Sequence, residues 1–174
     1  MSDTPEFSRP FDLRGITIKP VTVTANEAER AALARRFDIV SISSLSAELS
    51  LEAKGADIHA RGTLIAEVVQ SCAVSGEDLP LTVREEIDLR FVPAERLEVA
   101  QPDTEVELAA DELDEVGYAG TSIDLGEAVA QTLALAIDPY VEGPNADAFR
   151  REQGLLEAGA EGPLAAALKG LLKG

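Results

Sequence analysis

The sequence predicts an α+β fold: an antiparallel β-meander of three long strands plus edge strands, covered by a central helix and followed by a short C-terminal helix. Residues 45–53 and 79–91 alternate apolar and polar side chains, which is typical of strands with one solvated face. Residues 122–140 instead repeat apolar side chains at steps of four, as a helix lying on a sheet does. Three strand-like runs in succession, joined by short polar connections, favour a meander.

Length and composition fit one domain over residues 1–174, with a core over about 10–140, a linker over 141–162 that we expect to be mobile, and a terminal helix over 163–173. Hydrophobic residues make up 45% of the chain, whereas aromatic residues make up only 4%. The core must therefore be built mainly from Leu, Val, Ile and Ala.

The N-terminal part predicts edge strands and one helix. Residues 11–23 hold short apolar alternations interrupted by Pro20, which indicates edge pieces because proline cannot donate to a ladder. Residues 25–37 are rich in Ala, Glu and Arg and predict a helix of about three turns. Thr24 and Glu27 have the spacing of a capping box at its start.

Three long strands are predicted next. In residues 39–55 the apolar side chains fall on odd positions from Leu45 onward but on an even position at Ile42, so we expect a bulge near Ser43–Ser44. Residues 57–71 form a strand that is more apolar on both faces. Residues 79–91 alternate again and complete the meander.

The remaining chain predicts a long connection and a helix. Residues 93–121 read as an acidic loop with a short strand at Glu105–Leu108. Asp124 is placed to cap the central helix and Pro139 to stop it. Its broad apolar stripe, which includes Leu135, would lie across the inner face of the meander.

The stretch SCAVSGEDLP, residues 71–80, raises the question of a redox or metal site. Cys72 begins a Cys-x-x-Cys spacing, but Ser75 occupies the fourth position. The chain holds one cysteine and one histidine, too few soft ligands for zinc or a cluster, and it offers no resolving thiol. We therefore expect no metal or cofactor, and we interpret the stretch as a β-turn with Cys72 packed at its base.

Catalytic motifs are also missing. The sequence has neither a G-x-S-x-G elbow nor a G-x-x-x-x-G-K-[ST] phosphate loop. Glu85 falls on the apolar face of its strand, where it would either pair with an arginine or mark a bulge. The sequence thus predicts a protein that is not an enzyme; the alternative is a hydrolase or other enzyme that uses carboxylates near the sheet.

The net charge of −17 is concentrated in one segment. Residues 97–149 hold 13 acidic side chains and no Lys, Arg or His. Such a segment repels phosphate, which argues against broad direct binding of nucleic acid. It is either a solubilising face or a dock for a basic protein, with the C-terminal leucines as an apolar anchor. The candidate partner-binding residues are Asp103, Glu105, Glu107, Asp111, Glu112, Asp114, Glu115, Leu164, Leu168 and Leu171.

The N-terminus has no apolar run of the kind that opens a signal peptide, and no window approaches the roughly 18 apolar residues of a membrane span. The single cysteine excludes an internal disulfide. We therefore expect a cytoplasmic protein without a membrane partner.

Three segments in order resemble the YceD-like family, the large ribosomal RNA subunit accumulation proteins of bacteria and plastids: GTLIAEVVQSCAVSGEDLPLTVREEIDLRFVP (62–93), SIDLGEAVAQTLALAIDPY (122–140) and GPLAAALKGLLKG (162–174). The resemblance covers roughly residues 10–174. Many members carry two cysteines at the strand junction, so the serine in the second position implies that a metal held there elsewhere is not held here. The family-motif positions are Cys72, Ser75, Asp124, Leu125, Gly126 and Glu127.

The resemblance implies a non-enzymatic ribosome-biogenesis factor that supports accumulation of large-subunit ribosomal RNA. With the acidic segment, it suggests that the basic protein partner is a ribosomal protein or an rRNA-processing factor. A holding chaperone for a newly made ribosomal protein is a further alternative. The resemblance assigns no catalytic residue.

Overall fold

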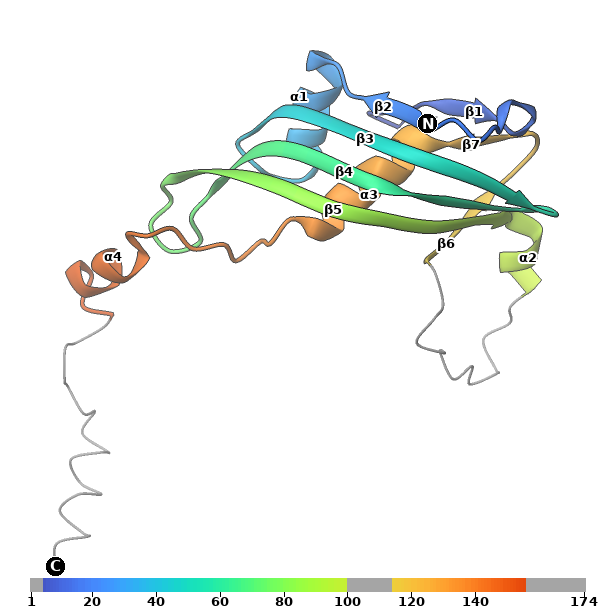
Figure 1. Cartoon of the computed structure of the whole chain (residues 1–174). Helices are drawn as coiled ribbons and strands as arrows, with labels where there is room; N and C mark the ends of the chain where they lie inside the picture. Colours follow the sequence, from blue (N-terminus) through green and yellow to red (C-terminus); the bar gives the residue numbers. More distant parts are fainter. Residues whose placement is uncertain (1–4, 100–113, 156–174) are drawn as a thin grey trace, which may run out of the picture.

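The computed structural model describes residues 5–99 and 114–155. A curved five-stranded sheet has the order β2-β3-β4-β5-β6, and a separate two-stranded sheet pairs β1 with β7 (Figure 1). The strands are β1 (Pro10–Asp12), β2 (Val21–Thr24), β3 (Ser41–Lys54), β4 (Asp57–Ser71), β5 (Asp78–Pro93), β6 (Asp114–Tyr118) and β7 (Ser122–Asp124). The helices are α1 (Glu27–Arg36), α2 (Ala94–Val99), α3 (Leu125–Ala136) and α4 (Ala146–Glu152), with a 3-10 turn at Leu13–Gly15.

The predicted α+β class and the antiparallel meander of three long strands are confirmed. The register between β3 and β4 shifts between Ile42 and Ser44, where the change of apolar phase predicts a bulge. Within β4, Gly62 lies against the neighbouring strand so closely that an added Cβ would overlap the carbonyl oxygen of Glu48. The meander therefore needs glycine at this position.

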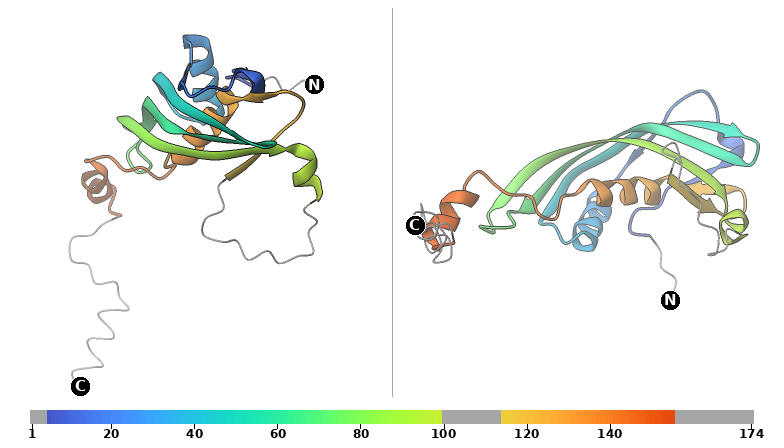
Figure 2. Two further views of the ribbon diagram at one scale, coloured as in Figure 1. Left: turned by 45° about the vertical axis from the view of Figure 1, so that its right-hand side comes forward. Right: turned by 90° about the horizontal axis from the view of Figure 1, so that it is seen from below.

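The core lies on the concave side of the sheet, where α1 and α3 both pack (Figure 2). Fully buried leucines from α1, from β3 and β4 and from α3 meet there, and each stabilises the fold by about 1.5–3 kcal/mol through removal of apolar surface from water. Those with the lowest exposure are Leu33, Leu45, Leu49, Leu64, Leu125 and Leu133.

Helix α3 begins after Asp124, whose side chain accepts a hydrogen bond from the N–H of Glu127, and ends before Pro139, as predicted. The prediction that Leu135 belongs to the buried apolar stripe is wrong, because this residue is 83% exposed. Leu135 follows the fully buried Leu133 by two positions, about 200° further around the helix, and so does not share the buried side of α3.

The capping box of α1 is two residues later than the sequence suggests. Thr24 belongs to β2, where it pairs with Ser46. Asn26 is the N-cap, its side chain accepts from the N–H of Glu29, and the Glu29 carboxylate accepts from the Asn26 N–H. Because β2 keeps Thr24 in a ladder, the Thr24–Glu27 prediction is wrong.

Three elements occur where the sequence predicts a loop or a linker. Strand β6 and helix α2 lie within the region 93–121, and β6 pairs with β5 in parallel. Helix α4 lies within the predicted linker 141–162, and its Arg150 pairs with Glu142 and Asp147. The predicted strand at 105–108 and helix at 163–173 lie outside the described residues.

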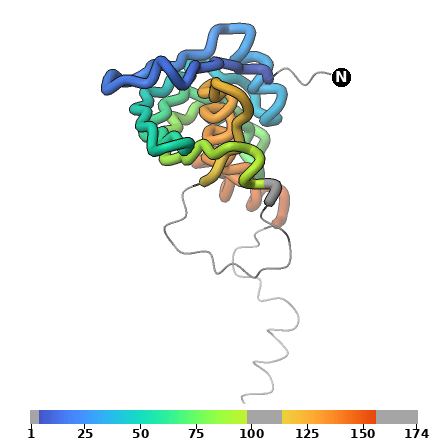
Figure 3. Tube along the Cα trace, turned by 90° about the vertical axis from the view of Figure 1, so that its right-hand side faces the viewer, coloured from blue at the N-terminus to red at the C-terminus, as the bar shows by residue number. Residues whose placement is uncertain are grey.

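The N-terminal segment of the described residues meets the start of the central helix. Strand β1 lies beside β7, which leads directly into α3 (Figure 3). The pairing joins Pro10 to Asp124, so the start of the chain is fixed to the start of the central helix. Within 5–99 and 114–155, the helices are all too short or too polar to cross a membrane.

Candidate functional site

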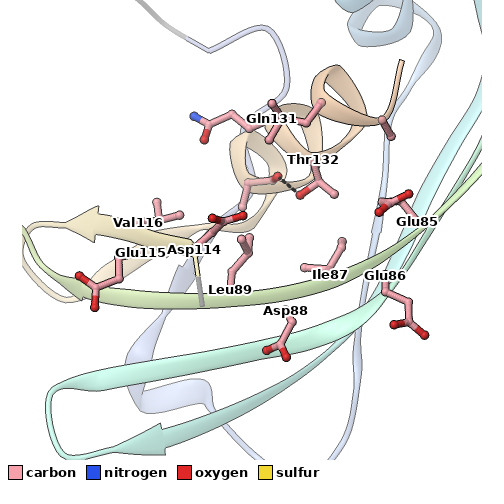
Figure 4. A pocket seen from close by; sticks show the side chains of 13 residues that line it. Glu85, Glu86, Ile87, Asp88, Leu89, Asp114, Glu115, Val116, Gln131 and Thr132 are labelled. Atoms are coloured by element: carbon pink, nitrogen blue, oxygen red, sulfur yellow. Dashed lines mark hydrogen bonds between the residues drawn. The ribbon is translucent and has the colours of Figure 1, made fainter. Parts of the chain in front are cut away.

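A groove of about 670 Å³ opens between β5, β6 and α3 (Figure 4). Its apolar surface comes from alternate residues of β5 and from one side of α3. Five acidic residues line the groove, and among the described residues no Lys, Arg or His does. We call it the acidic groove, lined by Glu85, Glu86, Ile87, Asp88, Leu89, Asp114, Glu115, Val116, Ala128, Gln131, Thr132, Leu135 and Ala136.

The alternation of β5 determines which side chains face α3. Ile87 and Leu89 point toward the helix and are buried, whereas Glu86 and Asp88 point to the opposite face of the strand (Figure 4). The carboxylates of Glu86 and Asp88 therefore lie on the face of β5 that is turned away from the apolar strip. Such a surface suits a partner with both apolar and cationic side chains.

Glu85 shares the inward face with the apolar residues of β5. It lies opposite Leu64 of β4 in a register that runs unbroken, so the predicted bulge does not occur. Glu85 also forms no ion pair with any residue in 5–99 or 114–155, and its side chain remains exposed. The two interpretations offered by its sequence position are therefore wrong.

Two of the five groove carboxylates are balanced by arginines of this chain. Glu115 pairs with Arg90 of β5, and Asp88 pairs with Arg61 of β4. Glu85, Glu86 and Asp114 make no ion pair within the described part of the chain. The groove thus keeps an excess of negative charge, and half-exposed pairs of this kind contribute little to stability.

Of the predicted partner-binding residues, the structure places Asp114 and Glu115 in the acidic groove. Glu85, Glu86 and Asp88, which join them, are absent from the predicted set. The parallel pairing of β5 with β6 brings the acidic residues of the two strands together, and no local sequence pattern predicts this pairing. The predicted residues Asp103, Glu105, Glu107, Asp111, Glu112, Leu164, Leu168 and Leu171 lie outside the described residues.

Several other carboxylates of the segment 97–149 are used inside the molecule. Glu127 pairs with Arg36 of α1, and Glu142 and Asp147 pair with Arg150 of α4. The described part of the segment is therefore not one continuous acidic face. Asp114 is the carboxylate of this segment that lines the groove without an ion pair among the described residues.

The motif Asp-Leu-Gly-Glu at the start of α3 joins three parts of the fold. The Asp124 carboxylate accepts hydrogen bonds from the Ser8 hydroxyl, from the Arg9 N–H at 2.8 Å and from the Glu127 N–H at 3.1 Å. Leu125 is buried with 1% exposure. The motif therefore fixes the N-terminal segment to α3 as well as capping the helix, and we call these contacts of residues 124–127 the clamp.

Gly126 and Glu127 complete this clamp. A Cβ at Gly126 would lie 2.7 Å from the carbonyl oxygen of Phe7 and 2.8 Å from the N of Arg9, so only glycine lets the N-terminal backbone pass. Glu127 forms an ion pair of 2.9 Å with Arg36 and so ties α3 to α1. All four motif positions have structural contacts.

Cys72 lies at the base of a turn, as predicted. Its N–H donates to the carbonyl of Glu77 at 2.8 Å, and Gly76 takes a positive φ of 73°. The buried sulfur accepts from the N–H of Gly143 at 3.3 Å and from the N–H of Ser75 at 3.4 Å. These donors, Gly143 first, lower the pKa of the Cys72 thiol from 9.0 to about 7.

The Cys72 turn joins the meander to the chain that follows α3. Besides the sulfur contact, the N–H of Ala73 donates to the carbonyl of Val141 at 2.9 Å. Ser75 occupies the position of the second cysteine in a two-cysteine motif, and its backbone N–H donates to the Cys72 sulfur. Across 5–99 and 114–155, no three His, Cys, Asp or Glu side chains are grouped so that they could hold a metal ion.

Comparison with known families gives one match. The sequence model described as "Large ribosomal RNA subunit accumulation protein YceD" matches residues 60–162, a span that includes most of β4, all of β5, the Cys72 turn, the acidic groove and α3. No curated protein and no solved structure matches the chain.

Proposed function

The chain belongs to the YceD family of large ribosomal RNA subunit accumulation proteins, and we propose that it supports this accumulation by binding a basic protein in the acidic groove. The observation that carries the proposal is the lining of the groove: five acidic residues, an apolar strip and, among the described residues, no cationic residue. A basic protein with apolar residues beside its cationic ones complements both features.

Charge favours a protein partner over RNA. Phosphate contacts supply most of the affinity of ordinary RNA-binding surfaces, and they require lysines and arginines. The groove offers the opposite charge, and the whole chain carries −17. Ribosomal proteins and rRNA-processing factors are commonly basic, so they are the class of partner that we propose.

The unpaired carboxylates would act mainly on the rate of association. Opposite charges steer two proteins toward a productive encounter, and salt weakens this steering because it screens exposed charges. The apolar strip formed by Ile87, Leu89 and Val116 would then contribute to the lifetime of the complex.

Affinity purification of the full-length tagged chain from cells, followed by mass spectrometry, tests the proposal. Nuclease treatment removes partners that are bridged by RNA, and elution in rising salt reports on charge. We expect a basic protein that survives nuclease treatment and is released by salt. Recovery that depends on intact RNA, or that is unaffected by salt, would contradict the proposal.

A charge-reversal pair makes the same experiment specific to the groove. Glu85→Lys with Asp114→Lys changes two groove carboxylates that have no ion-pair partner among the described residues. Glu48→Lys with Glu52→Lys changes the net charge equally on exposed positions of β3, outside the groove. The first variant should lose the partner, and the second should retain it.

The amount of the recovered protein distinguishes the holding-chaperone alternative. One newly made ribosomal protein in equal amount to the chain would identify a holder. Several processing factors in smaller amounts would instead identify an assembly or processing role.

A further inference from the structure

Strand β5 has an open edge. It pairs with β4 from Asp78 opposite Ser71 to Phe91 opposite Ile58. On its other side it pairs with β6 only at Leu89–Pro93. Between Asp78 and Asp88 this side pairs with no strand of the described residues, and Figure 1 shows β5 at the margin of the sheet there.

The hydrogen bonds at the Cys72 turn establish which backbone groups point out of that edge. The Cys72 N–H donates to Glu77 O, so these two residues form a hydrogen-bonded pair. In an antiparallel ladder, hydrogen-bonded and non-hydrogen-bonded pairs alternate, and the β4–β5 register is unbroken. The even-numbered residues of β5 therefore direct their backbone groups away from β4.

Pro80 is consistent with this assignment. It is even-numbered, so the N–H that proline lacks would have pointed out of the edge and the ladder with β4 loses nothing. Three residues consequently offer backbone N–H groups along the open edge without a partner in 5–99 or 114–155: Thr82, Arg84 and Glu86.

Two grooves follow the same edge. The acidic groove lies beside Glu85–Leu89, and a second groove of about 400 Å³ lies beside Leu79–Leu81, bounded by residues 142–145. Leu79, Leu81 and Val83 point to the inner face but are only partly buried, because α3 covers the other half of the strand. The edge thus borders apolar surface that is not fully covered.

The charges beside the edge select among possible strands. Glu85 and Glu86 carry no ion pair with a described residue, and Glu85 points inward, a feature that discourages pairing between copies of a protein. A second copy of this chain brings a charge of −17, and its own residues 103–112 carry five acids and no cation. The edge would repel a second copy of the chain and the acidic residues 103–112, and it would favour a cationic strand.

We propose that an extended, basic segment of the protein partner adds to the sheet along the open edge of β5, between Leu81 and Asp88. This rests on the proposed function and specifies how the acidic groove is used. The segment would receive hydrogen bonds from Thr82, Arg84 and Glu86 and would place apolar side chains against Val83 and Ile87. Eight residues of edge span about 26 Å, at about 3.3 Å per residue.

Amide hydrogen exchange on the isotope-labelled full-length chain tests this pairing. The probe is a blocked peptide with the sequence Lys-Val-Lys-Val-Lys-Val-Lys. We expect slower exchange at Thr82, Arg84 and Glu86, and little change at Val83 and Glu85, whose N–H groups already face β4. The alternating pattern identifies strand addition, because a peptide lying across the groove would not produce it.

Two matched peptides separate charge from backbone pairing. Replacing lysine by glutamate keeps the β-forming pattern and should abolish binding. Replacing valine by proline keeps the charge but removes three backbone N–H donors. Binding should weaken by roughly tenfold or more, and a tenfold loss of affinity corresponds to about 1.4 kcal/mol. Since neither peptide changes the protein, folding cannot explain the difference.

Arg84→Pro supplies the corresponding change in the protein. Its N–H faces outward, so the ladder with β4 stays intact, as it does at Pro80. Arg84→Ala is the control, because it removes the same side chain and keeps the N–H. The proline variant should lose the peptide while the alanine variant retains it.

The outcomes separate the two proposals. Binding that requires lysine but leaves all β5 amides unchanged would overturn strand addition and leave the proposed function standing. Equal binding of the lysine and glutamate peptides would overturn both. Slow exchange at Thr82, Arg84 and Glu86 in the free chain would overturn strand addition by a partner, and its dependence on protein concentration would reveal whether a second copy occupies the edge.

Discussion

The carboxylate of Asp124 accepts a hydrogen bond of 2.8 Å from the backbone N–H of Arg9, a residue 115 positions earlier in the chain. The same side chain caps α3 through the N–H of Glu127. One residue of the family motif therefore connects the N-terminal segment, β7 and the central helix.

Replacing Asp124 by alanine should lower the free energy of unfolding by about 2–3 kcal/mol, since the variant loses a helix cap and charge-assisted hydrogen bonds to the N-terminal segment. Chemical denaturation measures this change. Glu48→Ala, at an exposed position of β3, should change stability by less than about 0.5 kcal/mol. Similar values for the two variants would show that the clamp contributes nothing.

Replacing Gly126 by alanine should destabilise the fold by about 1–3 kcal/mol, although alanine is the better helix former, because the new Cβ would press on the backbone at Phe7 and Arg9. The opposite substitution at exposed Ala134 in the same helix is the control: Ala134→Gly should lower the free energy of unfolding by only about 1 kcal/mol. A Gly126→Ala variant that is more stable than wild type would refute the close approach.

Leu133 and Leu135 should respond differently to the same substitution. Leu133→Ala removes a side chain with 0% exposure and should cost about 2–5 kcal/mol, whereas Leu135, at 83% exposure, should cost less than about 0.5 kcal/mol. Thermal or chemical unfolding of both variants provides the comparison. Equal losses would mean that α3 is rotated relative to the sheet.

The Cys72 thiol should titrate with a midpoint of about 7, below the ordinary value of 9.0, because backbone N–H groups, that of Gly143 first, stabilise the thiolate. A pKa lowered by folding adds stability that is fully present above about pH 9 and is lost as the pH falls through about 7. Thiolate absorbance against pH measures the midpoint. The denatured chain should return to the ordinary value, and a folded midpoint near 9 would contradict the sulfur contacts.

The sequence allows the strands and the helix cap to be predicted because each depends on local chemistry. Period-two alternation identifies β3 and β5, the phase change at Ser43–Ser44 identifies the bulge, and Asp124 has the chemistry of a cap. The contacts of Asp124 with Ser8 and Arg9 could not be predicted, since they join residues more than 100 positions apart.

The candidate site was harder to predict than the fold. Its carboxylates meet because β6 pairs in parallel with the end of β5, which places Asp114 beside Leu89. A strand of five residues that contains a glycine and three charged or polar side chains resembles a loop when it is considered alone. Glu85 interrupts the apolar pattern of β5, and the sequence alone does not show that this residue lines the groove.

The most direct test of the central claim compares two charge-reversed chains as the only copy in living cells. Glu85→Lys with Asp114→Lys should lose the basic partner in purification and lower the amount of large-subunit ribosomal RNA, whereas Glu48→Lys with Glu52→Lys should preserve both. If the groove variant folds, retains the same partner and sustains normal ribosomal RNA, the acidic groove is not the binding site.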